Sequence, residues 1–404
     1  MLDPSIYYSD FYWNDLKIVE DHLNRLISGK NDVDYIENFR HKSLKKFKKA
    51  LVLNCGNGHV EREFISRNVV DSAIGIDISE DLINQAELNK GDKAIDYIVC
   101  DINLFDFDSI DFDLLIVFAA GHHIKCLNKV FAATRKKLLQ NNGMIVGFDY
   151  IGAHRNQYDY EVWEKINHYN KKLPVYLQNE LTYPHLPTML ETDPSEAIHS
   201  ELLEEVLKKY FNLNITMLGG GIAYEILSHN DKLRKIIDKN ENIEIINNFV
   251  KSVLDWDIKE SKKDNRFNFF TSFYGNPIKN LDEDKISRDI EDEYLYENKF
   301  PLGKSYYPNT FLQDLTEELS NKSIEVVHKQ KYIDECHRKI DKLSREAEEY
   351  SKKEKIFSEL SLKKFLKTYI KKKIHNKFKK FIPYKFFKFK LIRFFKKPEN
   401  KNID

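Results

Sequence analysis

The stretch KALVLNCGNGHVEREF, residues 49–64, decides the fold. The four consecutive apolar residues from Ala50 to Leu53 are typical of a short strand that is covered on both faces. Two glycines follow, at positions 56 and 58, and then a segment of helix-compatible composition. We therefore expect a buried strand that turns into a helix at an edge of a sheet, where the backbone of the turn can approach a ligand.

The same alternation of strand-like and helix-like segments continues to about residue 150. Four further apolar runs follow the first strand: SAIGID (72–77), IDYIVC (95–100), FDLLIVF (112–118) and GMIVGFD (143–149). Five strands separated by helices or short connections predict an α/β fold with a doubly wound, mostly parallel, Rossmann-like sheet.

The bulk composition divides the chain into parts of opposite charge. Its 404 residues are too many for one ordinary core, which favours two or three units. The formal net charge is zero, but residues 361–397 contain fifteen Lys or Arg and no acid. Residues 1–360 therefore carry a net charge of minus fourteen, so that an acidic body precedes a basic tail.

The cysteines and the hydropathy of the chain indicate the cellular compartment of the protein. The four cysteines lie far apart without the spacing of metal ligands, so we expect reduced thiols and no metal. The sequence MLDPSIYYSD lacks the pattern of an export signal, and no run of about 18 apolar residues occurs. These features predict a cytoplasmic protein.

Acidic residues follow the second and third predicted strands. Asp77 comes twenty-one residues after Gly56, a spacing that suits a carboxylate holding the ribose hydroxyls of an adenosine. Asp101 follows the third strand, within reach of an adenine amino group. A dinucleotide fold would place a third glycine at position 61, but the residue there is Glu61. The alternative interpretation is two glycines in an ordinary turn, with both aspartates capping the helices that follow.

The ordered motifs resemble those of class I S-adenosylmethionine-dependent methyltransferases. The resemblance rests on LVLNCGNGHVE, IGIDISEDLINQA, YIVCDIN, FDLLIVFAAGHHI and LLQNNGMIVGFDYIG, and covers about residues 35–150. The later segments GAHRNQY, DPSEAIHS and GGGI are similar to a subgroup found among bacterial surface-polysaccharide genes, and extend the resemblance to about residue 275. The family's fold does not need the missing glycine, and it implies a last, antiparallel strand, for which RFNFFTSFYG is the candidate.

The resemblance implies S-adenosylmethionine as cofactor and assigns its contacts. Cys55, Gly56 and Gly58 would border its methionine part, Asp77 its ribose and Asp101 with Ile102 its adenine, whereas Phe118 and Ala119 would contact it through their backbone. The full set of implied cofactor residues is Asn54, Cys55, Gly56, Asn57, Gly58, Asp77, Ile78, Asp101, Ile102, Phe118 and Ala119. Asn54 departs from the family, where glycine or an acid is more usual, although its side-chain carbonyl can still accept a hydrogen bond from an ammonium group.

Methyl transfer to a hydroxyl needs a general base beside the activated methyl group. The candidates for this base are His123 first, then His122, Glu196 and Tyr150, because imidazole titrates near neutrality and all lie in segments that can reach the same cleft. Arg155 and Asp149 are candidates for holding the acceptor. Each of these residues also has an ordinary structural interpretation, as a loop histidine, a surface arginine or a core aromatic residue.

The sequence after residue 150 indicates an insertion within the first domain, a linker, a coiled coil and a basic tail. Residues 1–280 form the predicted methyltransferase domain, in which 151–205 is a substrate-facing insertion and NLNITML begins a pair of further strands. Residues 281–309 are polar and acidic, which predicts a linker. Residues 310–357 have heptad spacing that predicts a coiled coil and hence a homo-oligomer, with a long single helix as the alternative.

The basic tail, residues 358–404, points to an anionic partner. Ten aromatic residues lie among the fifteen cations of residues 361–397, which favours a peripheral membrane anchor. Nucleic acid and the absence of any dedicated ligand are the alternatives.

Together these features predict an enzyme that O-methylates a sugar or glycan near the inner face of a membrane. A catalytically inactive scaffold that keeps the cofactor fold is the main alternative, and Asn54 is the feature that favours it. A methyltransferase for nucleic acid is less favoured, because no Pro-Pro-Tyr type motif follows FDLLIVF.

Overall fold

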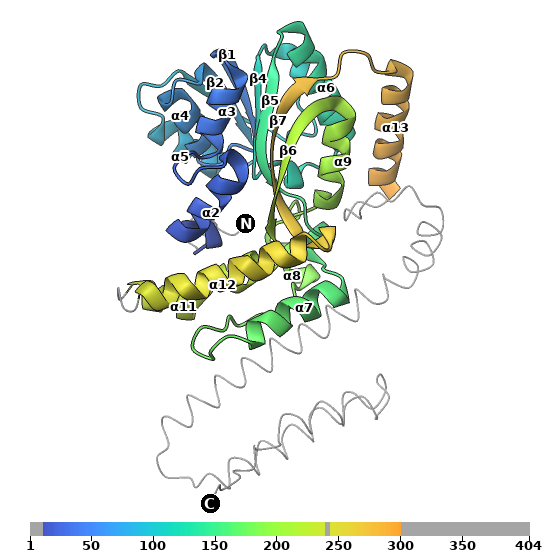
Figure 1. Cartoon of the computed structure of the whole chain (residues 1–404). Helices are drawn as coiled ribbons and strands as arrows, with labels where there is room; N and C mark the ends of the chain where they lie inside the picture. Colours follow the sequence, from blue (N-terminus) through green and yellow to red (C-terminus); the bar gives the residue numbers. More distant parts are fainter. Residues whose placement is uncertain (1–10, 239–242, 300–404) are drawn as a thin grey trace, which may run out of the picture. The chain divides into compact units, whose positions relative to one another are not determined.

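A computed structural model describes residues 11–238 and 243–299, which lie in the first of the two units of the chain, residues 1–313 and 314–404. Within these residues the strands form one seven-stranded sheet (Figure 1). The strands are β1 (Phe47–Leu53), β2 (Val70–Asp77), β3 (Ile95–Val99), β4 (Leu114–Phe118), β5 (Met144–Tyr150), β6 (Phe211–Gly220) and β7 (Asn268–Pro277). Their order across the sheet is β3-β2-β1-β4-β5-β7-β6.

The pairing of the strands confirms the predicted Rossmann-like sheet. The five strands β1 to β5 pair in parallel, whereas β7 lies antiparallel between β5 and β6. The stretch RFNFFTSFYG therefore supplies the predicted antiparallel strand, and NLNITML lies within β6. Since β1 to β4 all run the same way, their carboxyl ends meet at one edge of the sheet, which is the edge that holds the site.

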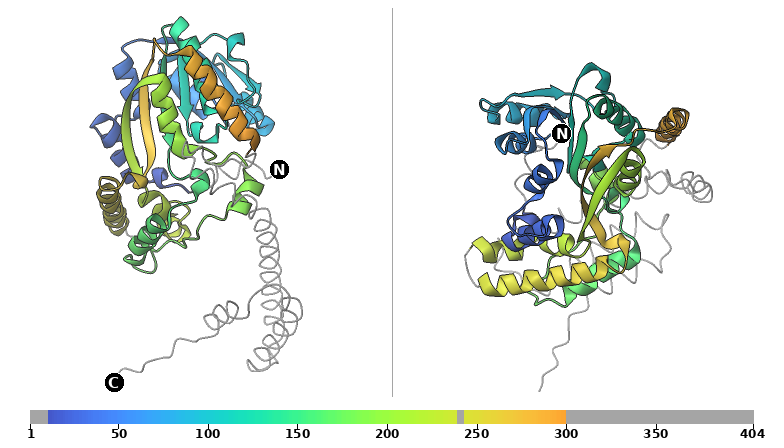
Figure 2. Two further views of the ribbon diagram at one scale, coloured as in Figure 1. Left: turned by 90° about the vertical axis from the view of Figure 1, so that its right-hand side faces the viewer. Right: turned by 45° about the horizontal axis from the view of Figure 1, so that its top comes forward.

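Both faces of the sheet are buried, because alternate residues of its strands point to opposite cores. Leu51 and Leu53 of β1 lie in one core, whereas Ala50 and Val52 lie in the other. The first core is covered by α6 (Leu127–Gln140) and α9 (Ser200–Tyr210), and the second by α3 (Tyr35–Ser43), α4 (His59–Ser66) and α5 (Glu80–Asn89) (Figures 1 and 2). This burial explains why β1 is a continuous apolar run and not an alternating one.

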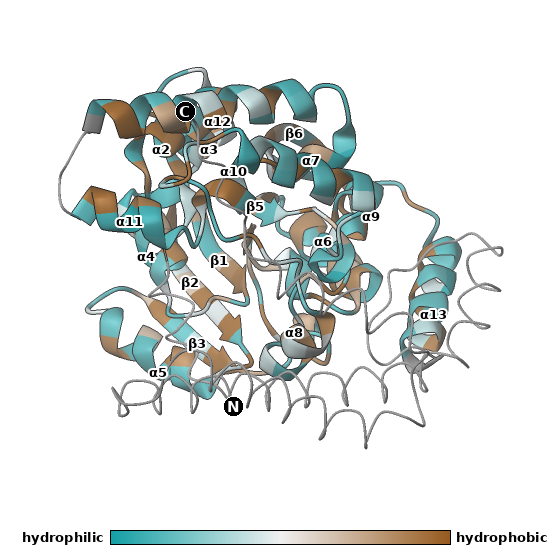
Figure 3. Ribbon diagram, turned by 90° about the horizontal axis from the view of Figure 1, so that it is seen from below, coloured by the Kyte–Doolittle hydropathy of each residue, from teal (hydrophilic) through white to brown (hydrophobic). Residues whose placement is uncertain are grey.

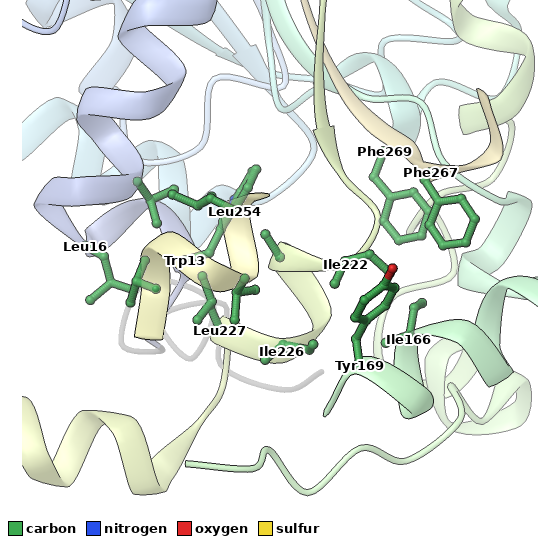
Figure 4. Close-up of a cluster of buried hydrophobic side chains, with 14 of the residues drawn as sticks. Trp13, Leu16, Ile166, Tyr169, Ile222, Ile226, Leu227, Leu254, Phe267 and Phe269 are labelled. Carbon is green, nitrogen blue, oxygen red and sulfur yellow. The ribbon is translucent and has the colours of Figure 1, made fainter. Parts of the chain in front are cut away.

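A third core, the edge core, covers the carboxyl ends of β5 and β6. It contains Tyr150 of β5, Leu218 of β6 and Phe269 at the start of β7. Figure 4 shows Phe269 with other members of this core. Most of its other members lie on four helices, α2 (Lys17–Ser28), α7 (Tyr160–Lys171), α10 (Ala223–Leu227) and α12 (Ile243–Ser261). The edge core thus brings together residues that are far apart in the sequence, from Trp13 to Phe269. It packs against the carboxyl-terminal edge of the sheet beside β5 and β6.

The three glycines at 219–221 end β6 in an irregular turn. Gly219 and Gly220 have φ values of +70° and +97°, which only glycine adopts readily. The Asp257 carboxylate on α12 accepts hydrogen bonds from the backbone N–H groups of Gly220 and Ile222, both at 2.7 Å, and of Ala223 at 3.0 Å. A Cβ atom at Gly219 would lie 2.2 Å from the Asp257 carboxylate, so this turn requires glycine for packing as well as for its φ angle.

The predicted insertion, residues 151–205, divides between two roles. Its first part contains α7 and, after a loop, α8 (Leu186–Thr192). Its last residues begin α9, which packs on the sheet through Leu203. The boundary at 205 was therefore placed too late, because the apolar face of α9 belongs to the sheet core. Between β6 and β7 the chain also forms α11 (Asp231–Asp238), which precedes α12.

The predicted acidic linker is wrong for residues 283–299. This segment forms α13 (Glu283–Lys299), whose Ile286 is buried against the core under α6. Glu293 accepts hydrogen bonds from the backbone N–H groups of Asn128 at 2.7 Å and Lys129 at 3.1 Å, in the first turn of α6. Figure 3 shows that α13 is mostly hydrophilic (teal), whereas β1 and β2 are mostly hydrophobic (brown). The hydropathy of α13 therefore resembles that of a linker.

The predicted coiled coil (310–357) and basic tail (358–404) lie outside the described residues. Among the helices that the structure describes, none is both long and apolar enough to cross a membrane.

Candidate functional site

The turn after β1 adopts left-handed backbone at three positions. Asn54, Gly56 and Gly58 have φ values of +45°, +56° and +77°. The side-chain amide of Asn54 donates a hydrogen bond of 3.0 Å to the Ala120 carbonyl beyond β4, which ties the two strand ends together. Because the Asn54 nitrogen is engaged, the side-chain oxygen is the atom that can accept from a ligand.

Asp77 at the end of β2 connects this turn to the next helix. Its Oδ2 accepts from the Gly56 N–H at 2.9 Å and its Oδ1 from the Ser79 N–H at 2.8 Å. The side chain is buried, whereas that of the next residue, Ile78, is 68% exposed. A carboxylate oxygen can accept more than one hydrogen bond, so Asp77 is able to bind hydroxyl groups in addition to these two backbone donors. Ile78 offers an apolar surface beside it.

Asp101 and Ile102 follow β3 and point in different directions. The Asp101 carboxylate is partly exposed, and its Oδ1 accepts hydrogen bonds from the backbone and side-chain amides of Asn103, both at 2.8 Å. The Ile102 side chain is buried in the core between the sheet and α6. Only the backbone of Ile102 can therefore contribute to a ligand site, whereas Asp101 can contribute its side chain.

Phe118 is the last residue of β4, and Ala119 follows it. Ala119 is exposed and has a φ value of +48°, and its N–H donates to the Phe148 carbonyl at 2.7 Å. The Phe118 ring stacks on Tyr35 of α3 with ring centroids 4.9 Å apart. The Phe118 side chain thus packs within the protein, and the exposed backbone of Ala119 faces the sheet edge.

A buried cluster below the glycine turn was not predicted. A Cβ atom at Gly58 would lie 2.2 Å from the Tyr97 hydroxyl, so packing inside the protein already requires glycine at this position. Beside this hydroxyl lies Glu61, which is fully buried in the first turn of α4. Burial raises the pKa of Glu61 to about 7, against the opposing effects of the helix backbone and of Tyr97. The residue that occupies the position of a third glycine is therefore part of a polar core.

The sequence candidates His122, His123 and Glu196 come together and are called the histidine cluster below. The Nε2 atom of His122 lies 3.9 Å, and that of His123 3.7 Å, from the Glu196 Oε2. Both histidines lie in a single turn of 3-10 helix, Gly121–His123, directly after β4. Glu196 is brought to them by the loop before α9, because the Ile198 N–H donates to the His122 carbonyl at 3.0 Å.

Hydrogen bonds orient both imidazole rings in the same sense. The Nδ1 of His122 lies 2.7 Å from the Asp149 Oδ1, and that of His123 lies 3.1 Å from the Ser195 hydroxyl. The Ser195 hydroxyl itself donates to Asp193 at 2.6 Å, so it accepts from His123. Since the carboxylate of Asp149 is an acceptor, each Nδ1 carries a proton and each Nε2 atom is left facing Glu196.

The two histidines differ in pKa for physical reasons. Burial lowers the pKa of His122, but Asp149, Glu196 and Asp193 outweigh it and raise that pKa to about 8. Burial and the neighbouring His122 lower the pKa of His123, and the same carboxylates only partly oppose them. Adjacent groups with separated pKa values are typical of functional sites.

Asp149 is a positioning residue and not the substrate ligand that the sequence analysis expected. Its carboxylate is fully buried and accepts hydrogen bonds from the N–H groups of Ala120, Gly121, His122 and Tyr150 in addition to the His122 ring. These donors use both oxygens, so Asp149 fixes the turn that carries the histidines. The expectation was wrong because the alternation of β5 directs Asp149 inward.

Tyr150 and Arg155 also take structural positions. Tyr150 lies in the edge core against Phe269, and burial raises its pKa well above 10, which rules out a role as a base near neutral pH. Arg155 is 2% exposed and donates to the Glu196 carbonyl at 2.9 Å. It therefore fixes the Glu196 loop, whereas the sequence had predicted that it binds the methyl acceptor. Both predictions are corrected because burial removes these side chains from the acceptor's reach.

The aromatic residues of the insertion divide in the same way. Tyr158 is buried and stacks on Phe269 with ring centroids 4.9 Å apart, and Trp163 packs against the same core. Tyr160 is 75% exposed. Of these three rings, Tyr160 is therefore the one that presents its surface to solvent.

One family model matches the chain, over residues 51–147, and its description is methyltransferase domain. Residues 51–147, which match this model, are called the methyltransferase domain below. This domain runs from the last three residues of β1 to the middle of β5, and it includes Asn54, Asp77, Asp101 and both histidines of the cluster. Glu196 and the edge core lie outside it.

Two solved structures illustrate what the chain is similar to. Phosphoethanolamine N-methyltransferase 2 of Haemonchus contortus is 17% identical, with 60% of this chain and 52% of that chain covered and a TM-score of 0.35. The PH0226 protein of Pyrococcus horikoshii OT3 is 16% identical, with 61% and 89% covered and a TM-score of 0.35. The chain thus spans about half the length of the Haemonchus enzyme. No curated protein matches the chain.

The residues of the methyltransferase domain fit S-adenosylmethionine as its cofactor. Asn54 offers an acceptor for an ammonium group, Asp77 a carboxylate for two hydroxyls, and Asp101 an acceptor for an amino group. The exposed Ile78 side chain and the exposed backbone of Ala119 lie at the same sheet edge. Donors and acceptors of the types that the cofactor requires are therefore present on the ends of four strands.

Proposed function

We propose that the protein is an S-adenosylmethionine-dependent methyltransferase that methylates an oxygen atom of a sugar or glycan. The observation that carries this proposal is the set of acceptors at the ends of β1, β2 and β3, next to a histidine cluster at the end of β4. The first set suits the cofactor, and the second suits removal of a hydroxyl proton. A fold alone would support neither conclusion.

The cofactor, when bound, supplies a methyl group on a cationic sulfur, and an acceptor oxygen takes this group with its own electron pair as the sulfur keeps the pair of the broken bond. The chain has to orient the acceptor, exclude water and accept a proton. His123 and Glu196 are each partly exposed, with 23% and 29% of their side-chain surfaces accessible, so an acceptor hydroxyl can reach them. Both lie beyond Ala119, on the side away from Asp77.

The histidine cluster, beside which the methyl acceptor would bind, favours an oxygen atom as the nucleophile. An oxygen acceptor must lose its hydroxyl proton, and Glu196 and the Nε2 atom of His123 provide acceptors for it. The segments GAHRNQY and DPSEAIHS, which resemble the polysaccharide-associated subgroup, lie together here: the Arg155 N–H donates to the Ala197 carbonyl at 2.7 Å. The contact between these two segments beside the histidine cluster supports a carbohydrate as the methyl acceptor.

The proposal extends to the cell membrane through the composition of the chain. Residues 361–397 carry fifteen cations and ten aromatic residues, a composition suited to an anionic lipid surface. The heptads of residues 310–357 would join two or more copies and so multiply the contacts with this surface. We therefore place the enzyme in the cytoplasm, at the inner face of the membrane, where lipid-linked glycans are accessible.

The test is transfer of an isotopically labelled methyl group from S-adenosylmethionine to a panel of lipid-linked glycans, free sugars and RNA. We expect the label in carbohydrate, as an ether that resists mild base, and its loss in Glu196→Gln. Asp71→Asn is the matched control, because Asp71 lies at the other end of β2 and is 59% exposed. Label in RNA would favour the nucleic-acid alternative, and binding of the cofactor without any labelled product would favour the scaffold.

A further inference from the structure

The three side chains of the histidine cluster have the arrangement of a metal site. The ligand atoms of His122, His123 and Glu196 all lie within 4.8 Å of one another, and two of the separations are 3.9 and 3.7 Å. Two ligands that each lie about 2.1 Å from Zn²⁺ at a tetrahedral angle are about 3.4 Å apart. Shifts of a few tenths of an ångström would bring Glu196 to this spacing from both histidines. We propose that His122, His123 and Glu196 bind one divalent transition-metal ion.

The hydrogen bonds around the cluster are those that a metal-binding histidine requires. Each Nδ1 atom is engaged, one by the buried Asp149 and the other by Ser195, which is itself held by Asp193. Histidines that bind metals through Nε2 commonly donate their other N–H to a carboxylate, a carbonyl or a water molecule. The Asp149–His122 pair has this form directly, and His123 has it through one hydroxyl group.

The charge and the donor atoms favour a transition-metal dication. Three carboxylates, Asp149, Asp193 and Glu196, lie around two imidazoles, and the Arg155 guanidinium balances only part of their negative charge. Two nitrogen donors and one oxygen donor suit Zn²⁺, Fe²⁺, Mn²⁺ or Co²⁺, whereas Mg²⁺ and Ca²⁺ prefer sites made of oxygen alone. The partial exposure of His123 and Glu196 gives the ion an entry path and leaves positions for an exchangeable ligand.

The position of the cluster assigns the ion a role, which rests on the proposed function. Coordination of the acceptor hydroxyl would lower its pKa and release its proton to solvent, so that no imidazole has to act as the base. The binding of the ion itself does not depend on methyl transfer. The spacing of the cysteines predicted no metal, and the sequence gives no local motif for this cluster because Glu196 lies 73 residues after His123.

The test uses the full chain, without a purification tag and stripped of metal by a chelator, and follows Co²⁺ binding by its visible absorption. We expect one equivalent of Co²⁺ to give the bands of a site with nitrogen and oxygen ligands, and Zn²⁺ to displace it. Glu196→Gln and His123→Gln should each weaken Co²⁺ binding by about 100-fold or more, and Ser195→Ala by about tenfold. Glu196 and His123 are partly exposed, so both variants should fold.

The matched control is His41→Gln, since His41 and Glu37 form an exposed histidine–glutamate pair with 2.9 Å between His41 Nε2 and Glu37 Oε1. This variant should bind Co²⁺ like the original protein. Absence of the bands from the original protein, or equal bands in Glu196→Gln and His123→Gln, would overturn the metal site. Calorimetric titration of each protein with S-adenosylhomocysteine separates the two proposals: failure of this binding with intact Co²⁺ binding removes the proposed function and leaves the metal site.

Discussion

At the ends of β1 and β2, the polar contacts of Asn54 and Asp77 join residues that all lie within 51–147, whereas at the ends of β4 and β5 the contacts of the histidine cluster involve residues beyond 147. Asp77 bonds to Gly56 and to Ser79, within one strand–helix–strand unit. The histidine cluster depends on Asp149 and on the Glu196 loop, which Arg155 holds. The cofactor side is thus a local property of the methyltransferase domain, and the acceptor side is assembled from outside it. Substitutions on the two sides should therefore have separable effects.

The largest expected effect is that of Asp149→Ala. This change leaves five donors without their acceptor in a buried region and should lower the free energy of unfolding by about 3 to 5 kcal/mol. Urea denaturation measures it. The control is Asp113→Ala, which removes a partly exposed aspartate that accepts from the Lys48 and Lys49 N–H groups and should cost about 1 kcal/mol. Equal losses for the two variants would contradict the central role of Asp149.

The second prediction concerns pH and Glu61. Its pKa is raised to about 7 in the folded protein, so the unfolded chain releases this proton first as the pH rises. The stabilisation that protonated Glu61 provides is complete below about pH 4.5 and is lost as the pH rises through about 7, by up to about 3 kcal/mol. Tyr97, Arg62, Asp77 and Cys55 are the titratable or charged groups that face it.

Urea denaturation of Glu61→Gln and of the original protein between pH 4.5 and 8 tests this prediction. The variant lacks the titrating group. As the pH rises over that range, the free energy of unfolding of the original protein should therefore fall more than that of the variant. Parallel curves would show that Glu61 does not titrate in this window.

Gly58→Ala should destabilise the protein by about 2 kcal/mol, through its positive φ and its contact with the Tyr97 hydroxyl. The double variant with Tyr97→Phe removes the closest atom and should recover part of this loss, which thermal denaturation of the four proteins of the cycle will measure. Strict additivity would mean that Tyr97 is not the obstacle. In that case the positive φ of Gly58 and the nearby Ala86 side chain would account for the loss.

The smallest effect is expected outside the methyltransferase domain. Glu293→Ala removes the acceptor for two N–H groups in the first turn of α6 and should cost about 1 kcal/mol in urea denaturation. Glu291→Ala, an exposed position on the same helix, should have no measurable effect. Identical stabilities for the two variants would restore the interpretation of residues 283–299 as a linker.

The same comparison explains what the sequence could predict. The five parallel strands and Asp77 follow from runs of apolar residues and from a fixed spacing, because both are local. The histidines were found for their chemistry, but nothing in the spacing shows that Glu196 faces both of them or that Asp149 points inward. Such contacts are decided by the packing of the edge core, which no short window of sequence contains.

Two further misses have related causes. The hydropathy of α13 gave no helix signal, because important contacts with α6 and α9 are made by Glu293 and Glu297. Arg155 and Tyr150 were expected at the surface of a cleft, but a buried polar residue and an exposed one look the same in sequence. In each case a polar side chain has a structural role that hydropathy does not report.

Calorimetric titration with S-adenosylhomocysteine of the original protein, Asp77→Ala and Glu196→Gln tests the central claim most directly. We predict micromolar binding by the original protein, a loss of about 100-fold or more in Asp77→Ala, and binding within about threefold of the original in Glu196→Gln. Failure of the folded original protein to bind, or equal losses in the two variants, would contradict a cofactor site at the ends of β1 to β3 that is separate from the histidine cluster.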